Sequence, residues 1–292
     1  MDFYKYHGLG NDYIVIDAAK CCFQLTDEVV RLICDRHYGV GSDGILLGIF
    51  TGSFSKAAAS LRIYNPDGSE AEKSGNGLRI FAWFLYEHGY IDSLTFPIQT
   101  RGGSVLVRIV DMSKKIVEVD MGTPNFSART AAPSMGLDEI VDQRYNFGIG
   151  IYRATFVSLG NPHCVIYGQP VNEALTRKIG PIIECSPIFP ARVNVQFMEV
   201  ISLAEIRIQI WERGAGYTMS SGSSSCAAVA AAHRMGLTDK SVRVHMPGGT
   251  MRVVLTEHSV LLSGPVEKVF EGNFSVDLMK KIEALGSKPI TS

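Results

Sequence analysis

The sequence lacks any run of apolar residues long enough to cross a membrane. No segment approaches the roughly 18 uninterrupted apolar residues that a spanning helix requires, and residues 1–17 do not show the charged-then-apolar pattern of a secretory signal. We therefore expect a cytoplasmic protein with no membrane partner.

The chain also lacks an excess of charge of either sign. It carries 28 basic and 29 acidic residues, a formal net charge of −1, and no long run of like charge. A protein that binds nucleic acid or an anionic membrane usually presents a basic patch or stripe. We expect no nucleic-acid partner and predict a small-molecule ligand instead.

Motifs for metals and common cofactors are missing as well. The cysteines form no CxxC pair and have no histidine at ligand spacing, so we predict no metal site and interpret them as free thiols. No glycine-rich phosphate motif of the GxGxxG or GxxxxGK[ST] type joins a predicted strand to a predicted helix, and no lysine has an evident pyridoxal context, so we predict a reaction without a cofactor. The six cysteines are Cys21, Cys22, Cys34, Cys164, Cys185 and Cys226.

What the sequence does contain is the pattern of a mixed α/β protein. Its 292 residues, 46% apolar and 20% charged, suit two globular domains of about 150 residues each. In the first half we predict a strand, a loop at 8–12 and a second strand, a helix at 27–34 capped by Thr26, and a helix from about 78 to 88. The other strands predicted there are 45–50, 60–64, 95–99, 103–110 and 115–121.

The second half repeats this order. Its predicted strands are 151–158, 163–167, 193–200 and 204–211, then 242–246, 250–256 and 259–264 after an alanine-rich helix at 224–235. Ser74-Gly75 and Ser221-Gly222 precede the two central helices and lie 221 − 74 = 147 residues apart, about half of the chain. We interpret the halves as a duplication, although a capping pattern can also recur by coincidence.

The predicted fold class is therefore α/β (α+β), with two pseudo-symmetric lobes, each a mixed sheet around a central helix. We place the N-terminal lobe at 1–125 and the C-terminal lobe at 126–267, with segment 268–292 packing back on the first lobe.

The two helix starts are the predicted site of chemistry. A helix N-terminus leaves amide groups unpaired and carries a partial positive charge, so small residues there favour binding of a carboxylate. If both starts hold one carboxylate, Ser74 and Ser221 lie on opposite faces of the α-carbon. One side chain then removes a proton and the other returns one, which inverts the stereocentre.

Polar residues at predicted strand ends supply candidates for recognition. An isolated asparagine is often only a turn residue, but an arginine beside a glutamate can bind the carboxylate and the ammonium of a zwitterion. The candidates are Asn11, Asn65, Asn161, Asn194, Glu212 and Arg213.

Six segments together resemble the diaminopimelate epimerases, cofactor-independent enzymes of lysine and cell-wall precursor synthesis: 7–13, 36–44, 62–72, 75–77, 160–163 and 211–216. The resemblance implies an isomerase that forms a homodimer and closes two similar lobes on its substrate. It implies that the six candidates just named bind the substrate. It further implies that Gly75, Asn76, Gly222 and Ser223 surround the substrate carboxylate.

The sequence departs from this family at the predicted bases. Family members usually carry a cysteine before each helix, where this chain has Ser74 and Ser221. A serine hydroxyl is a much weaker acid than a thiol and needs an activating partner, for which His163 and Glu212 are candidates. Cys226, five residues after Ser221, does not replace the missing thiols. Tyr217, where the family usually has glutamate, and the serine-rich run 220–225 favour natural serines over engineered ones.

The sequence thus predicts an epimerase or racemase of diaminopimelate or a similar zwitterionic amino acid, acting through two bases. Two alternatives stay open. The same fold can support another carbanion reaction, such as elimination or isomerisation of a small acid. A catalytically silent amino-acid-binding homologue is the other.

Overall fold

Both ends of the chain belong to the same folding unit. The computed structural model describes residues 1–49, 59–132 and 136–285. Unit 1 comprises Met1–Val119 and Pro265–Ser292, and unit 2 comprises Asp120–Gly264. Within the described ranges, no helix is long and apolar enough to cross a membrane.

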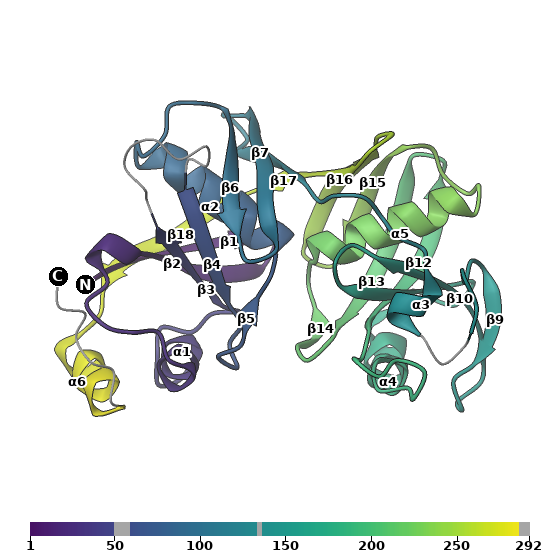
Figure 1. The fold of residues 1–292 in the computed structure, drawn as a ribbon, viewed down its shortest axis with the longest axis horizontal. Coiled ribbons are helices and arrows are strands. Elements are labelled where there is room, and N and C mark those ends of the chain that lie inside the picture. Colours follow the sequence, from purple (N-terminus) through teal and green to yellow (C-terminus); the bar gives the residue numbers. More distant parts are fainter. Residues whose placement is uncertain (50–58, 133–135, 286–292) are drawn as a thin grey trace. The chain divides into compact units, whose positions relative to one another are not determined.

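Unit 1 contains a mixed sheet and two helices from the N-terminal segment, joined by a strand and a helix from the C-terminal segment (Figure 1). Its elements are β1 (Asp2–Gly8), β2 (Asn11–Asp17), the short 3-10 turn η1 (Ala18–Lys20), α1 (Asp27–Cys34), β3 (Ile45–Ile49), β4 (Ala59–Tyr64), β5 (Glu70–Ala71), α2 (Gly75–Glu87), β6 (Thr95–Thr100), β7 (Gly103–Asp111), β8 (Ile116–Asp120), β18 (Glu267–Asn273) and α6 (Val276–Ala284).

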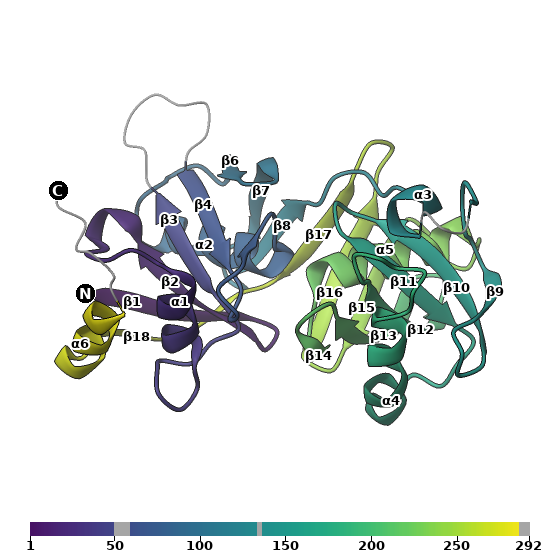
Figure 2. The same cartoon turned by 60° about the horizontal axis from the view of Figure 1, so that its bottom comes forward.

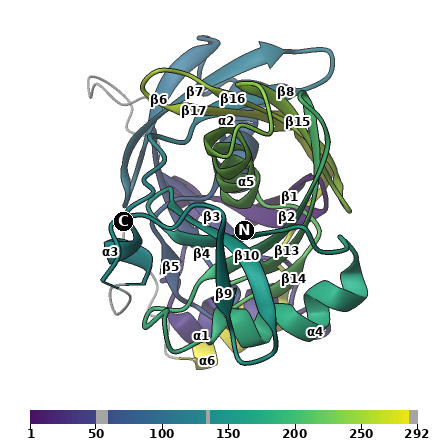
Figure 3. The same ribbon diagram turned by 90° about the vertical axis from the view of Figure 1, so that its right-hand side faces the viewer.

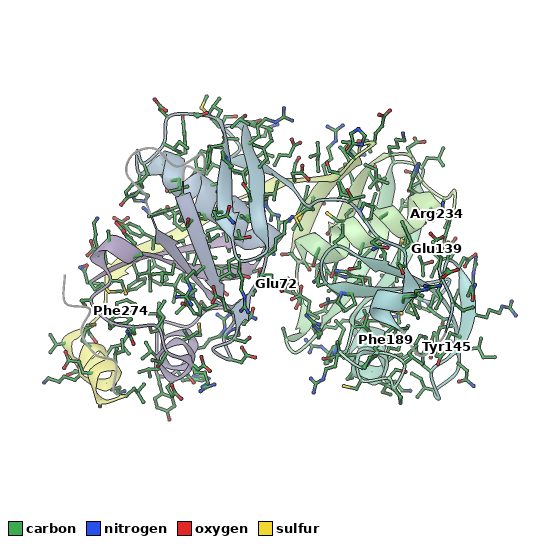
Figure 4. The ribbon with its side chains drawn as sticks, viewed as in Figure 1. Glu72, Glu139, Tyr145, Phe189, Arg234 and Phe274 are labelled. Carbon is green, nitrogen blue, oxygen red and sulfur yellow. The ribbon has the colours of Figure 1, made fainter. Side chains whose placement is uncertain are left out.

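Helices cover both faces of the strands in unit 1. Residues 12–17 of β2 are all buried, as expected for a strand packed on both faces. Figure 1 shows α2 on one side of β2 and β3 and α1 on the other. Figures 1 and 2 both place α6 on the α1 side, where Ile282 and Phe274 join the cluster built on α1. Figure 4 labels Phe274 in that cluster.

Unit 2 has the same kinds of elements. They are α3 (Ala128–Ala131), β9 (Gln143–Asn146), β10 (Ile151–Ser158), β11 (Pro162–Tyr167), α4 (Glu173–Glu184), β12 (Asn194–Ser202), β13 (Glu205–Glu212), β14 (Gly216–Thr218), α5 (Gly222–Arg234), β15 (Ser241–Met246), β16 (Gly249–Leu255) and β17 (Val260–Pro265).

Helix α5 is the central helix of unit 2. Figure 3 shows it nearly end-on, with β10, β13, β15 and β16 around it. Of its 13 residues, those from Ser224 to Ala232 are all buried, and most are alanines that let the strands approach closely. Helix α4 covers the other face of β12 and β13 (Figure 1), beside a cluster that includes Phe189 and Tyr145, both labelled in Figure 4.

The two units repeat one connectivity. In unit 1, β1–β2 pair antiparallel, β2–β3 parallel, β3–β4–β5 antiparallel, β4–β6 parallel and β6–β7–β8 antiparallel. In unit 2 the same types of pairing occur, in the same order, from β10 to β17. The predicted α/β class, with two pseudo-symmetric mixed sheets around central helices, is confirmed.

Several predicted element boundaries need correction. The central helices begin at Gly75 and Gly222, three and two residues before the predicted starts at 78 and 224. The predicted strand 45–50 is β3, which ends at Ile49, and residue 50 lies outside the described residues. Helices α4 and α6 were not predicted.

Candidate functional site

The serines at the two helix starts are N-caps. Ser74 has an extended backbone, and its Oγ accepts a hydrogen bond from the Gly77 amide at 3.1 Å. Ser221 has the same conformation, and its Oγ accepts from the Ser224 amide at 3.4 Å. An N-cap side chain satisfies one amide of the first turn and leaves the others directed away from the helix. Each hydroxyl is therefore held beside a ready anion site.

Small residues shape the first turn of α2. A Cβ on Gly77 would lie 2.9 Å from Cδ2 of Leu46 and 3.3 Å from Oγ of Ser74. Glycine at this position therefore lets the helix start sit directly against β3 and keeps the serine hydroxyl uncrowded.

A directional chain of hydrogen bonds links the start of α2 to β2. Arg79, which is fully buried, donates from Nη2 to Oδ1 of Asn76 at 2.9 Å. Asn76 donates from Nδ2 to Oδ1 of Asn11 at 2.8 Å, and Asn11 donates to Oδ2 of Asp43 at 3.0 Å. Because a guanidinium only donates and a carboxylate only accepts, the two ends of the chain fix the orientation of both amides.

The carboxylate end of this chain is held by cations. Burial opposes ionisation of Asp12, but hydrogen bonds from Arg36 and Lys5 outweigh it and lower its pKa to about 2. Burial and the neighbouring Asp12 charge raise the pKa of Asp43 above its usual value. Arg36 contacts both carboxylates at 2.8 Å and so compensates the pair.

Asn65 lies at the same edge of the sheet as Asn11. It directly follows β4, whose last residue Tyr64 pairs with Ile45 at the start of β3. Its side-chain amide donates to Oγ of Ser69 at 3.0 Å, within the turn that joins β4 to β5.

In unit 2, polar side chains connect β11 and β12 to the start of α5. The Nε2 amide of Gln196 lies 3.1 Å from Nδ1 of His163 and donates to Oγ of Ser224 at 3.0 Å. The other ring nitrogen of His163 lies 3.1 Å from Oδ1 of Asn161. Asn161 in turn donates to Oγ of Ser223 at 3.5 Å. His163 is thus the neutral Nε2–H tautomer, accepting from Gln196 and donating to Asn161.

The surroundings of His163 oppose its protonation. Burial lowers its pKa, the charge of Arg213 adds to this effect, and the hydrogen bond to Gln196 opposes it, for a pKa of about 3. Both ring nitrogens are already engaged. The low pKa and the two hydrogen bonds therefore disfavour the imidazole as a proton acceptor near neutral pH, and its Nε2 contact orients Asn161.

Asn194 and the pair Glu212-Arg213 lie at neighbouring strand ends of unit 2. Asn194 pairs with His163 across the parallel strands, and its Oδ1 accepts from the Arg213 amide at 3.0 Å. The Arg213 guanidinium donates to the carbonyl of Ala191 at 3.1 Å. Oε2 of Glu212 accepts from the hydroxyl of Thr218 at 3.2 Å.

Tyr217, the departure noted after Gly214-Ala215-Gly216, points along the strands. Its hydroxyl donates to Oε1 of Gln209 at 2.7 Å, and the guanidinium of Arg177 lies 4.3 Å from its ring centroid. Burial raises its pKa. This tyrosine therefore packs between β13 and α4.

The repeat aligns the two sets of residues by position. Asn11, Tyr13, Gly44 and Leu46 correspond to Asn161, His163, Asn194 and Gln196 at a constant offset of 150. After the β3–β4 hairpin the offset is 147, because Ile45 pairs with Tyr64 as Val195 pairs with Trp211. Asn65 and Ser74 then correspond to Glu212 and Ser221.

The structure thus brings together Asn11, Ser74, Gly75 and Asn76 in unit 1, and Asn161, His163, Asn194, Arg213 and Ser223 in unit 2. Tyr13, Arg79 and Gln196 were not predicted as site residues. The signal was present for two of them, because Arg79 and Gln196 interrupt otherwise apolar runs. A polar residue in such a run is buried and needs a partner.

Comparisons of sequence with known proteins agree on one family. Its sequence profile, described as diaminopimelate epimerase, matches residues 3–127 and 155–269. The chain is 47% identical over 280 residues to diaminopimelate epimerase 2 of Nostoc sp. (strain PCC 7120), covering 95% of this chain and 97% of that protein. It is 40% identical over 280 residues to the diaminopimelate epimerase of Pelotomaculum thermopropionicum, covering 94% of this chain and 99% of that protein.

Solved structures share the fold at low sequence identity. A hydroxyproline epimerase from Agrobacterium vitis superposes with a TM-score of 0.68 at 16% identity, covering 95% of this chain and 93% of that one. A phenazine biosynthesis protein of the PhzF family from Bacillus anthracis superposes with a TM-score of 0.64 at 16% identity. The match covers 94% of this chain and 99% of that one. These likenesses show the two-unit architecture.

Proposed function

Because the chain belongs to the diaminopimelate epimerase family, we propose that it inverts the α-carbon of diaminopimelate or of a similar zwitterionic amino acid. As a member of that family it is an isomerase, an amino-acid epimerase. The observation that carries the proposal is the doubled helix start, with a capping hydroxyl at Ser74 and at Ser221.

The proposed chemistry begins with the substrate carboxylate at the helix starts. Removing the α-proton builds negative charge on the carboxylate oxygens, where preorganised amide groups stabilise it most. Gly75 and Asn76 offer such amides on α2, and Gly222 and Ser223 on α5. Ser74 and Ser221 then act on opposite faces of the α-carbon, so that one removes a proton while the other delivers one. No cofactor takes part in these steps.

The recognition set divides between the two units. We propose that Asn11, Asn65 and Asn161 hydrogen bond to the substrate, and that Asn194 holds the backbone of Arg213 in place. Arg213 then binds a carboxylate bidentately, and Glu212 accepts hydrogen bonds from an ammonium. In this proposal His163 acts through Asn161, whose amide it orients.

Serine makes the proton transfers harder than cysteine does. A thiol has a pKa near 8.5, so a small part is ionised at neutral pH, while an alcohol is not. We expect a slow enzyme whose rate depends on groups that assist the serines.

The test is exchange of the substrate α-proton with D₂O, together with chiral analysis. The panel contains L,L-diaminopimelate and derivatives of histidine, lysine and proline. We expect exchange and inversion for one member of this panel. Absence of both from all members contradicts the proposal, and an alkene or keto product without inversion indicates a different carbanion reaction.

Cysteine variants sharpen this test. Ser74→Cys combined with Ser221→Cys should raise the inversion rate, because each thiol is the stronger acid. Ser275→Cys is the matched control, since Ser275 caps α6 in the same way, accepting from the Leu278 amide at 3.2 Å. An inert double variant argues against diaminopimelate as the substrate.

We also propose that the enzyme acts in the cytoplasm, in amino-acid biosynthesis, as a homodimer. Its relatives carry the name of a biosynthetic enzyme. Sedimentation equilibrium tests the dimer, which has twice the 31.9 kDa mass of the chain.

A further inference from the structure

Tyr13 occupies a position of unit 1 from which it reaches the capping serine. It is the third residue of β2, and its counterpart in unit 2, at 163 − 13 = 150 residues, is His163. The Tyr13 hydroxyl lies 3.2 Å from Oγ of Ser74, and either oxygen can be the donor. The same Oγ accepts from the Gly77 amide.

We propose that Tyr13 is the proton-relay partner of Ser74. The inference rests on the proposed function and adds a positioning residue to it. Ser74 transfers the proton to and from the α-carbon, and Tyr13 keeps Ser74 from becoming an isolated alkoxide.

The relay balances in both directions. When Ser74 removes the α-proton, the Cα–H bond and the Ser74 O–H bond break, and a new Ser74 O–H bond and a Tyr13 O–H bond form. The negative charge moves from the Tyr13 phenolate to the substrate carbanion. In the return direction Ser74 gives its hydrogen to the α-carbon and takes the phenolic hydrogen, which leaves Tyr13 as the phenolate.

The bonding capacity of Ser74 allows this relay. A hydroxyl has one hydrogen and two acceptor lone pairs. The Gly77 amide occupies one lone pair at 3.1 Å, which fixes the oxygen in place. The second lone pair and the hydrogen are then shared between Tyr13 and the substrate.

The packing of unit 1 holds Tyr13 in this position. Its side chain is buried, 7% exposed. A Cβ on Gly44 would lie 2.7 Å from Cε1 of the Tyr13 ring and 2.4 Å from the carbonyl oxygen of Tyr64, so glycine leaves space for the ring. In unit 2 the corresponding residue is Asn194.

A phenol is a suitable partner for this step. Its ordinary pKa is about 10, within two units of the thiol value of about 8.5. A phenolate is therefore reached far more easily than a serine alkoxide.

Unit 2 lacks this arrangement among its described residues. Oγ of Ser221 hydrogen bonds there to the Ser224 amide. His163, the counterpart of Tyr13, is bound to Gln196 and Asn161 instead. The relay is consequently one-sided, and its loss should affect one face of the α-carbon only.

The experiment compares Tyr13→Phe with the wild type. Exchange of the α-hydrogen with D₂O is measured separately from each of the two stereoisomers that the wild type interconverts. We expect exchange from one stereoisomer to fall by about 10²-fold or more, the usual contribution of acid–base assistance. Exchange from the other, whose α-hydrogen faces Ser221, stays at the wild-type rate, while inversion slows by the same factor as exchange from the first.

Two variants serve as references. Ser221→Ala should lower exchange from the stereoisomer whose α-hydrogen faces Ser221 and leave exchange from the other stereoisomer unchanged. Tyr86→Phe, which removes a hydroxyl bound to Sδ of Met112 in the same unit, should change neither exchange rate. If Tyr13→Phe does not fold, a fluorinated tyrosine at position 13 keeps the hydroxyl, alters its acidity and must change exchange from one stereoisomer alone.

If Tyr13→Phe lowers the exchange rate equally for both stereoisomers, or lowers neither rate, the proposed relay is wrong. A wild-type enzyme that neither exchanges nor inverts any substrate contradicts the proposed function instead, so the two failures are distinguishable.

Discussion

His163 gives a sharp prediction, because its neutral state can be measured through stability. The side chain is fully buried, both ring nitrogens are hydrogen bonded, and its pKa is lowered to about 3. In the unfolded chain a histidine has a pKa of about 6.5. Below that pH the unfolded state binds a proton that the folded state does not, so the free energy of unfolding falls as the pH falls.

The size of the effect follows from the two pKa values. One pKa unit corresponds to about 1.4 kcal/mol, so lowering the pH from 7 to 5 removes about 2 kcal/mol through His163 alone. The loss continues down to about pH 3, where the folded protein also takes up the proton. Above pH 6.5 this contribution to stability is fully present.

The assay is urea unfolding at pH 7, 6 and 5, with the wild type and His163→Gln compared at each pH. The variant cannot titrate at this position, so its free energy of unfolding should fall by about 2 kcal/mol less between pH 7 and 5. The comparison cancels the contribution of the other histidines to the pH dependence of the free energy of unfolding. They include His88, whose pKa is lowered mainly by burial. Equal slopes for the two proteins would refute the buried neutral imidazole and return His163 to the candidate bases.

Three further predictions concern the elements around the site. Gly44→Ala places a methyl group against the Tyr13 ring and should lower the free energy of unfolding by about 1–3 kcal/mol in urea; an unchanged midpoint contradicts this packing. Arg79→Met removes the charge-assisted bond that orients Asn76 and should raise KM about tenfold or more in steady-state assays, whereas a normal KM shows that the amide chain does not position the substrate. Ser221→Ala removes an N-cap and should cost about 1 kcal/mol in urea unfolding, and a cost of zero means that the cap does not stabilise α5.

Local patterns predicted most of the secondary structure correctly. The helix at 27–34 was predicted at its observed bounds because Thr26 caps it and two acids fill its first turn. Strands β10 and β7 are rich in β-branched residues, and both were predicted within a residue of their observed bounds. The starts of α2 and α5 were placed late, since glycine, asparagine and serine are weak helix formers that the capping serines and tertiary packing override.

Helix α4 was missed for a related reason. It contains Gly180 and Pro181, which argue against a helix in any single window. The structure explains the glycine, because a Cβ there would lie 2.6 Å from Cβ of Trp211 on β13. Close packing on the sheet thus requires a residue that weakens the local helical signal.

The predicted site residues came from motifs, and their partners did not. Asn11, Asn161 and Arg213 stand in recognisable segments, whereas Gln196 lies inside a buried strand and reaches His163 and Ser224 from other elements. Such contacts depend on which strands are neighbours. The repeat offset of 150 before the β3–β4 hairpin became visible only once the strand register was known.

The pairing of β1 with β18 has a consequence for synthesis on the ribosome. Asp2 of β1 pairs with Asn273 of β18, so β1 gains this neighbouring strand only after residue 273 has been synthesised. Residues 120–264, by contrast, form a contiguous stretch that emerges complete. Unit 2 can therefore fold first, whereas unit 1 is completed only after β18 has been synthesised.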